Sequence, residues 1–101
     1  MAAVEKLEEE LDGKSELDLH SAGDMLRHAR EQKQLSIEDI AKETRIPQRH
    51  LSSLEAGDYG ALPGRTYAIG FGKSYARAVG LSDATIGNKL RDEMEDQGHG
   101  A

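Results

Sequence analysis

Residues 35–57 constrain the fold of this chain most strongly, because their pattern is that of two short helices joined by a tight turn. Ser36 can cap the first helix, and Asp39 three residues later completes the pattern of a capping box. Pro47 suits the first turn of a second helix, and Gly57 can end that helix in a left-handed conformation. The stretch therefore predicts a helix-turn-helix unit, whose second helix enters the DNA major groove in many regulators.

The rest of the chain adds three further helices and no strand, since no segment alternates apolar and polar residues. The first helix begins at a second capping-box pattern and ends at a bend occupied by Gln34. Glycine would adopt the backbone conformation of such a bend more easily. We expect an all-α, five-helix domain with helices at about residues 21–34, 37–43, 47–55, 64–79 and 83–95. Its predicted core comprises Leu26, Ala29, Leu35, Ile40, Ala41, Ile46, Leu51 and Leu54, joined by part of the fourth helix.

The charges divide the chain of 101 residues into an acidic start, a mildly basic middle and an acidic end. Residues 1–20 hold seven acidic residues against two lysines and few apolar anchors, so we expect a disordered tail. Residues 21–96 form the expected domain, and residues 97–101 a polar C-terminal tail. The chain has no cysteine, and its start lacks the apolar core of a secretory signal, so we expect a cytoplasmic protein.

The fourth predicted helix holds three of the four aromatic residues, Tyr67, Phe71 and Tyr75, at the i, i+4, i+8 spacing of a single stripe. This stripe is either the core face of the helix or a surface for a partner. A second apolar face on the same helix favours a division, in which one face packs inward and aromatic rings remain exposed. Lys73 and Arg77 would then add a basic rim to the partner surface.

Gly70 and Gly72 also lie within the fourth predicted helix, where each glycine costs about 1 kcal/mol relative to alanine. A glycine kept at such a cost usually marks the close approach of another chain segment. We therefore expect tight packing against this helix.

The second helix of the helix-turn-helix unit also offers side chains for DNA. Gln48, Arg49 and Ser52 are placed to reach base edges, and Arg45 in the turn could contact a phosphate. Pro47 at the start of this helix and the net charge of −6 argue against strong DNA binding. DNA binding by these four residues remains the alternative to protein binding.

A specific combination of motifs gives the chain a family resemblance. The stretch GDMLRHAREQKQLSIEDIAKETRIPQRHLSSLEAGDYGALPGRTYAIGFGKSYARAVGL, residues 23–81, resembles the cytoplasmic domain of the RodZ family of bacterial cell-shape proteins. The resemblance implies a five-helix domain of the lambda-repressor-like type. It also implies binding of the actin-like filament protein MreB, largely through the aromatic residues of the fourth helix.

The resemblance also suggests which residues would bind and where the protein would lie. Carried onto this chain, the filament-binding residues are Tyr67 and Phe71, with Tyr75, Lys73 and Arg77 as neighbours. RodZ proteins continue into a basic linker and a transmembrane helix. If such a helix follows Ala101, the domain would lie at the inner face of the cell membrane.

Enzymatic and metal-binding patterns are missing from the sequence. None of the four histidines has another histidine three or four residues away, and cysteine is absent. No glycine-rich phosphate loop follows a strand, and no nucleophile and base stand out. We therefore expect a binding domain with no cofactor, metal or small-molecule substrate.

Overall fold

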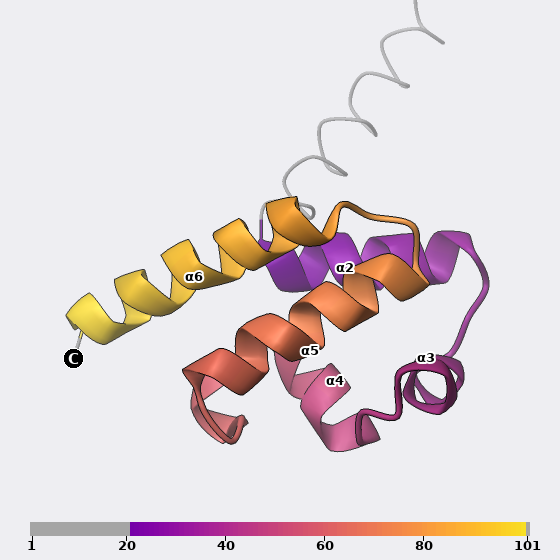
Figure 1. Cartoon of the computed structure of the whole chain (residues 1–101), viewed down its shortest axis with the longest axis horizontal. Coiled ribbons are helices and arrows are strands. Elements are labelled where there is room, and N and C mark those ends of the chain that lie inside the picture. The colour runs from indigo at the N-terminus through magenta and orange to yellow at the C-terminus, as the bar shows by residue number, and fades with distance from the viewer. Residues whose placement is uncertain (1–20, 101) are drawn as a thin grey trace, which may run out of the picture.

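The computed structural model describes residues 21–100, and within this part of the chain all the regular structure is helical (Figure 1). This confirms the predicted fold class. The elements in chain order are α2 (Ala22–Gln32), α3 (Ile37–Thr44), α4 (Gln48–Ala56), the short 3₁₀ helix η1 (Tyr59–Ala61), α5 (Arg65–Ala78) and α6 (Asp83–Gly100). The expected disordered tail, residues 1–20, lies outside the described residues.

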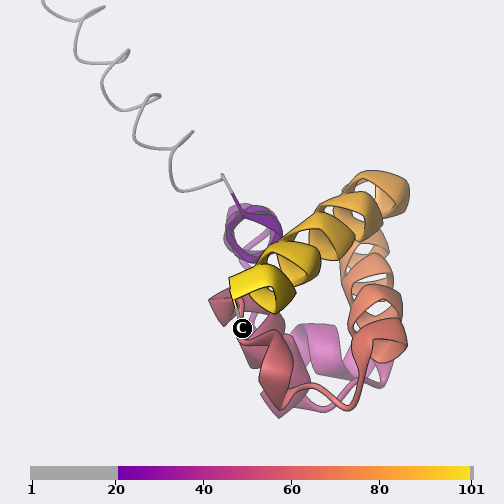
Figure 2. The ribbon, with the colours of Figure 1, turned by 90° about the vertical axis from the view of Figure 1, so that its left-hand side faces the viewer.

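The helix-turn-helix pair α3–α4 lies below α5 in Figure 1, and α6 covers the other side of α5. Figure 2 shows α2 beside α6, so that the first and last described helices are neighbours. Helix α5 packs against both the helix-turn-helix pair and α6. It therefore has two packed sides, which leaves only part of its circumference for solvent.

The ends of the helices are formed largely by the residues predicted for them. Ser36 Oγ accepts the backbone N–H of Asp39 at 3.0 Å, and Asp39 Oδ2 accepts the N–H of Ser36 at 2.8 Å, which completes the capping box. The second of these bonds holds the pKa of the Asp39 carboxyl below its ordinary value.

Gln34 and Arg45 adopt left-handed conformations at φ of 59° and 64°, so each turn uses a backbone conformation that glycine adopts more easily. Pro47 immediately precedes α4 instead of lying in its first turn.

Helix α6 corrects the sequence prediction at its C-terminal end. We expected this helix to stop near Glu95 and to leave residues 97–101 as a tail, but it continues to Gly100. Gln97 Nε2 donates to the carbonyl oxygen of Gly57 at 3.0 Å, which ties this last part of the helix to the end of α4. That contact joins residues forty positions apart, so local sequence patterns could not reveal it.

The core joins all the helices. Its buried hydrophobic residues are Ala22, Leu26, Ile40, Ile46, Leu51, Leu54, Tyr59, Leu62, Ala68, Tyr75, Ala76, Val79, Ile86 and Leu90. Five of the eight predicted core residues are in this set, and the other three, Ala29, Leu35 and Ala41, are partly buried against it.

Two glycines allow helices to approach closely. A Cβ atom on Gly72 of α5 would lie 2.1 Å from Leu90 Cδ1 of α6, which confirms the expected tight packing at this position. No such contact exists at Gly70, where a Cβ would meet nothing within 4 Å. The tightest backbone approach is instead at Gly23 of α2, where a Cβ would lie 2.4 Å from the carbonyl oxygen of Leu54.

No helix among residues 21–100 combines the length and the apolar composition needed to cross a bilayer.

Candidate functional site

Tyr67 is the exposed large hydrophobic side chain of the described residues, with 59% of its surface accessible. It lies in the first turns of α5, and its ring centroid is 5.8 Å from that of Phe71, one turn further along. The two rings are tilted by 48°, within the range of favourable aromatic pairs. An exposed aromatic side chain with a partly buried ring beside it on a helix surface is typical of a protein-binding site.

A third ring extends this pair onto the helix-turn-helix unit. His50 of α4 stacks on Phe71 with ring centroids 5.5 Å apart and an interplanar angle of 22°. We call Tyr67, Phe71 and His50 the aromatic ridge. His50 Nδ1 is buried and has no hydrogen-bond partner within the described part of the chain. The ridge therefore joins the surface of α5 to that of α4, a link that the sequence analysis did not include.

Tyr75, the third member of the predicted aromatic stripe, lies in the core instead. It is fully buried, and its hydroxyl donates a hydrogen bond to Glu55 Oε2. Burial and this bond to Glu55 raise the pKa of the Tyr75 phenol above its ordinary value. We therefore leave Tyr75 out of the candidate surface, because a buried ring cannot meet a partner.

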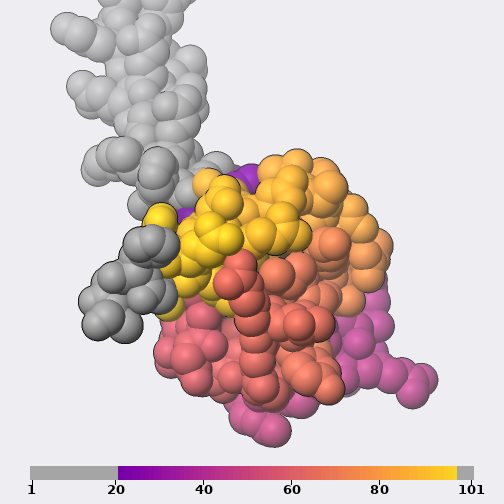
Figure 3. Space-filling view, turned by 60° about the vertical axis from the view of Figure 1, so that its left-hand side comes forward, coloured from indigo at the N-terminus to yellow at the C-terminus, as the bar shows by residue number. Residues whose placement is uncertain are grey.

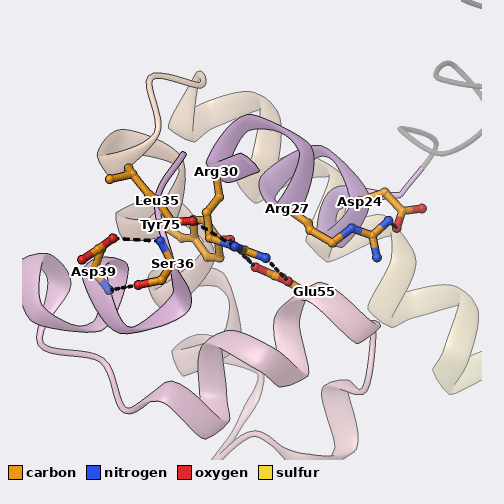
Figure 4. Close-up of polar contacts among 8 residues, drawn as sticks. All are labelled: Asp24, Arg27, Arg30, Leu35, Ser36, Asp39, Glu55 and Tyr75. Carbon is orange, nitrogen blue, oxygen red and sulfur yellow. Dashed lines mark hydrogen bonds and ion pairs between the residues drawn. The ribbon is translucent and has the colours of Figure 1, made fainter. Parts of the chain in front are cut away.

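The polar group around Tyr75 was not predicted from the sequence. Figure 4 shows the Arg30 side chain of α2 reaching between Glu55 and Tyr75. Arg30 Nε lies 2.9 Å from Glu55 Oε2 and 3.2 Å from Tyr75 Oη, and Arg30 Nη1 donates to the carbonyl oxygen of Leu35 at 3.0 Å. The bond to Glu55 raises the pKa of the Arg30 guanidinium further. This cluster fixes α5 against α2 and α4, and so holds the aromatic ridge in place.

Lys73 and Arg77 do not lie with the aromatic ridge. The Lys73 side chain runs along α6, where a Cβ on Gly87 would lie 2.6 Å from Lys73 Cε. Arg77 Nη1 forms an ion pair with Asp83 Oδ2 at 2.8 Å, and its hydrogen bond lowers the pKa of the Asp83 carboxyl. The predicted basic rim thus faces α6, and these two residues are separate from Tyr67 and Phe71.

The residues considered for DNA binding form a second candidate surface on α4 and the turn before it. Arg45, Gln48, Arg49 and Ser52 are all exposed. Neither arginine forms an ion pair among the described side chains. This surface adjoins the ridge, because Arg49 directly precedes His50.

Figure 3 shows the face of the molecule on which these elements meet, with α5 between α6 and the segments of the helix-turn-helix pair. Within the described residues no cluster of histidine, aspartate and glutamate is suited to hold a metal ion. One depression of about 520 Å³ is open to solvent and is bordered in part by Ser21, Tyr59 and Lys89.

Comparisons with known proteins identify the fold and its relatives. The profile of a family described as "Helix-turn-helix domain" matches residues 25–86. Among curated proteins, the chain is similar to the membrane protein YmfM of Bacillus subtilis, with 45% identity over 47 residues. That alignment covers 46% of this chain and 16% of YmfM. It is also similar to the cytoskeleton protein RodZ of Streptococcus pneumoniae, with 39% identity over 64 residues, which cover 63% of this chain and 23% of RodZ.

A solved structure shares the fold. YmfM from Staphylococcus aureus, described as a candidate DNA-binding membrane protein, superposes with a TM-score of 0.68 and 25% identity. The superposition covers 72% of this chain and 89% of that structure. Since the alignments span less than a quarter of the two curated relatives, the similarity concerns one domain of longer proteins.

Proposed function

The chain belongs to the helix-turn-helix domain family, in the form found in RodZ, and from this premise we propose that it is a docking domain for an actin-like filament protein of the MreB type. The observation that carries the proposal is the exposed ring of Tyr67, paired with Phe71 on α5. Interfaces between proteins are centred on such aromatic side chains, which supply a large apolar contact and a polar tip.

The contact surface in this proposal is narrower than the sequence resemblance implied. Tyr67 and Phe71 would meet the filament, and His50 would support Phe71 from α4. Lys73 and Arg77 could contribute only at the margin, on the side toward α6. If a transmembrane helix follows Ala101, as in RodZ, docking would take place at the inner face of the cell membrane.

Replacing Phe71 by alanine tests the proposal. Loss of a central aromatic anchor weakens binding by about 1–3 kcal/mol, which co-sedimentation with MreB filaments would measure. Because Phe71 also packs against the core, circular dichroism of the variant is needed to show that it remains folded. A folded Phe71→Ala variant that co-sediments as well as the unchanged chain would contradict the proposal.

DNA binding is the second candidate function, favoured by the two exposed arginines without ion-pair partners on the α4 surface. Gln48 and Arg49 could contact base edges, and Arg45 a phosphate. Such binding would weaken steeply with added salt, since each phosphate contact releases counterions. Loss of DNA binding in Arg49→Ala, with Tyr67→Ala unaffected, would support this function, whereas no binding to any duplex at low salt would exclude it.

A further inference from the structure

The aromatic ridge and the neighbouring arginines form a surface with two kinds of binding potential. Tyr67 supplies an open apolar contact, and the ring of Phe71 lies beside it. Arg49 directly precedes His50 of the ridge and Arg45 lies in the turn before α4, and neither arginine has an ion-pair partner among the described residues. An occupant that fits this surface would combine apolar side chains with several carboxylates.

No acidic residue of α4 compensates these arginines at the surface. The one acid in α4 is Glu55, and Arg30 already binds both of its carboxylate oxygens, at 2.9 and 3.2 Å. The two arginines of the turn and of α4 are therefore exposed and form no ion pair with a described residue, although Glu43 at the end of α3 is near Arg45 in sequence. An acidic segment nearby would be attracted to them, most strongly at low ionic strength.

The N-terminal residues of the chain have the complementary composition. Residues 1–20 hold seven acidic residues against two lysines. Within this segment, Val4, Leu7 and Leu11 follow the i, i+3, i+7 spacing of an apolar helical stripe. A short amphipathic segment of this kind is marginal as an isolated helix and gains stability when its apolar side meets a surface.

A series of contacts connects the attachment point of the segment to the ridge. It joins the domain at Ser21, and the next backbone N–H, that of Ala22, donates to Glu93 Oε2 at 2.8 Å. Tyr59 donates to the other oxygen of the same carboxylate, and it borders a depression that Gly64 and Arg65 also line. From Gly64, a Cβ atom would be 3.8 Å from the Tyr67 ring. These contacts lead from the attachment point to the start of α5.

The length of the segment is sufficient for this path. Twenty residues span about 30 Å as a helix and more than twice that when extended. The longest dimension of the structure is 51 Å, and its other two are 34 and 21 Å. Geometry therefore allows the segment to cover the aromatic ridge of its own domain.

We propose that residues 1–20 dock on the aromatic ridge and on Arg45 and Arg49 of the same chain, and so occupy the partner surface until a stronger ligand displaces them. Val4, Leu7 and Leu11 contact Tyr67 and Phe71, and the acidic side chains pair with the two arginines. The regulatory consequence rests on the proposed function, because the segment would then compete with the filament. Docking itself can be tested without any filament.

Paramagnetic broadening in the full-length chain tests the docking. Since the chain has no cysteine, an Ala3→Cys substitution accepts a single nitroxide label. Amide signals of His50, Tyr67 and Phe71 should lose most of their intensity in the oxidised sample relative to the reduced one. The same label in a Leu7→Ser/Leu11→Ser chain is the matched control, because this chain retains the tether and the charges. Loss of the two apolar side chains should restore most of the signal intensity.

Substitutions on the domain complete the test. Arg49→Gln should reduce the broadening, whereas Arg91→Gln, an exposed arginine on α6, should leave it unchanged. Broadening that is equal with and without Leu7 and Leu11 would reflect only the tether and would overturn the proposal. In a mixture of two chains, one isotopically labelled without nitroxide and the other carrying the nitroxide, broadening of the first by the second would indicate a second copy as the occupant. That result would also overturn the proposal.

Filament binding then separates this inference from the proposed function. If both hold, the Leu7→Ser/Leu11→Ser chain co-sediments with MreB several-fold more tightly than the unchanged chain. If the broadening is specific but neither chain co-sediments, docking stands and the filament proposal fails. If the chains co-sediment equally and the broadening is not specific, the filament proposal stands and the docking fails.

Discussion

Arg30, Glu55 and Tyr75 form the polar cluster on which the position of α5 depends. Arg30 and Glu55 retain 14% and 12% of their side-chain exposure, so the charges are largely removed from water and rely on each other. None of these contacts could be predicted from local sequence patterns, because 25 residues separate Arg30 from Glu55 and 45 separate it from Tyr75. Periodicity identifies which helix face is apolar, but it cannot identify which distant charge is its partner.

Removing the anion of this cluster should destabilise the fold. Glu55→Gln keeps the shape of the side chain and leaves the Arg30 cation largely buried without its counter-charge, at a cost of about 3 kcal/mol. Glu38→Gln is the matched control, because its pair with Lys42 is exposed and is worth about 0.5 kcal/mol or less. Urea unfolding measures both, and equal shifts in the two midpoints would contradict this role of the cluster.

The two buried tyrosines should make the protein sensitive to alkali. Burial, together with hydrogen bonds to Glu55 and Glu93, raises the pKa of Tyr75 and Tyr59 in the folded state. Their contribution to stability is complete below the unfolded pKa of about 10 and is lost as the pH rises above it, because only the unfolded chain can ionise readily.

Urea midpoints at pH 8 and pH 11 measure this alkaline loss. A Tyr59→Phe/Tyr75→Phe chain starts less stable, because three hydrogen bonds are lost, but it should show a smaller decline between the two pH values. An equal decline in both chains would assign the alkaline sensitivity to other groups.

Helix α5 shows how far the aromatic stripe could be interpreted from the sequence. The prediction that the helix would divide its apolar residues between the core and an exposed face agrees with the structure, since Ala68, Gly72 and Ala76 are buried and Tyr67 is exposed. Tyr75, which the resemblance gave as a neighbour of the filament-binding residues, is fully buried. At the i+8 position the stripe has turned about 80° from Tyr67, which is enough to carry the ring into the core.

The glycines at helix contacts give a paired prediction. Gly23→Ala places a Cβ atom 2.4 Å from the backbone oxygen of Leu54, and backbone cannot move aside as a side-chain tip can. We expect a loss of about 2 kcal/mol or more from forced separation of α2 and α4. Gly70→Ala, where the space is open, should instead stabilise α5 by about 0.5–1 kcal/mol.

Thermal unfolding of the two glycine variants checks the sign of each effect. The melting temperature should fall for Gly23→Ala and rise for Gly70→Ala relative to the unchanged chain. A fall in both would mean that glycine at position 70 has a packing role that the structure does not show.

For the molecule as a whole, the sequence indicated the helical fold and the helix-turn-helix unit well, because caps, turn residues and apolar spacing are local signals. Predicted boundaries differ from the structure by only a few residues, apart from the longer α6. The candidate site was predicted less completely. Tyr67 and Phe71 lie side by side as expected, but the contribution of His50 depends on how α4 packs against α5, which no local pattern encodes.

The fold also determines which of the charged side chains have ion-pair partners. Arg65 and Arg77 form ion pairs with acidic residues of α6, while Arg45 and Arg49 have no such partners among the described residues. The surface that could bind an acidic partner is therefore on α4 and the adjacent ridge, although the sequence analysis placed the basic rim on α5.

Co-sedimentation of a Tyr67→Ala chain with MreB filaments is the decisive measurement for the filament-docking function. Tyr67 is 59% exposed, so the substitution should leave the fold intact and weaken binding by about 2 kcal/mol, or roughly 30-fold. Thr66→Ala, an exposed change on another side of α5, should bind as the unchanged chain does. Equal binding of the Tyr67→Ala, Thr66→Ala and unchanged chains would show that the aromatic ridge is not the docking surface.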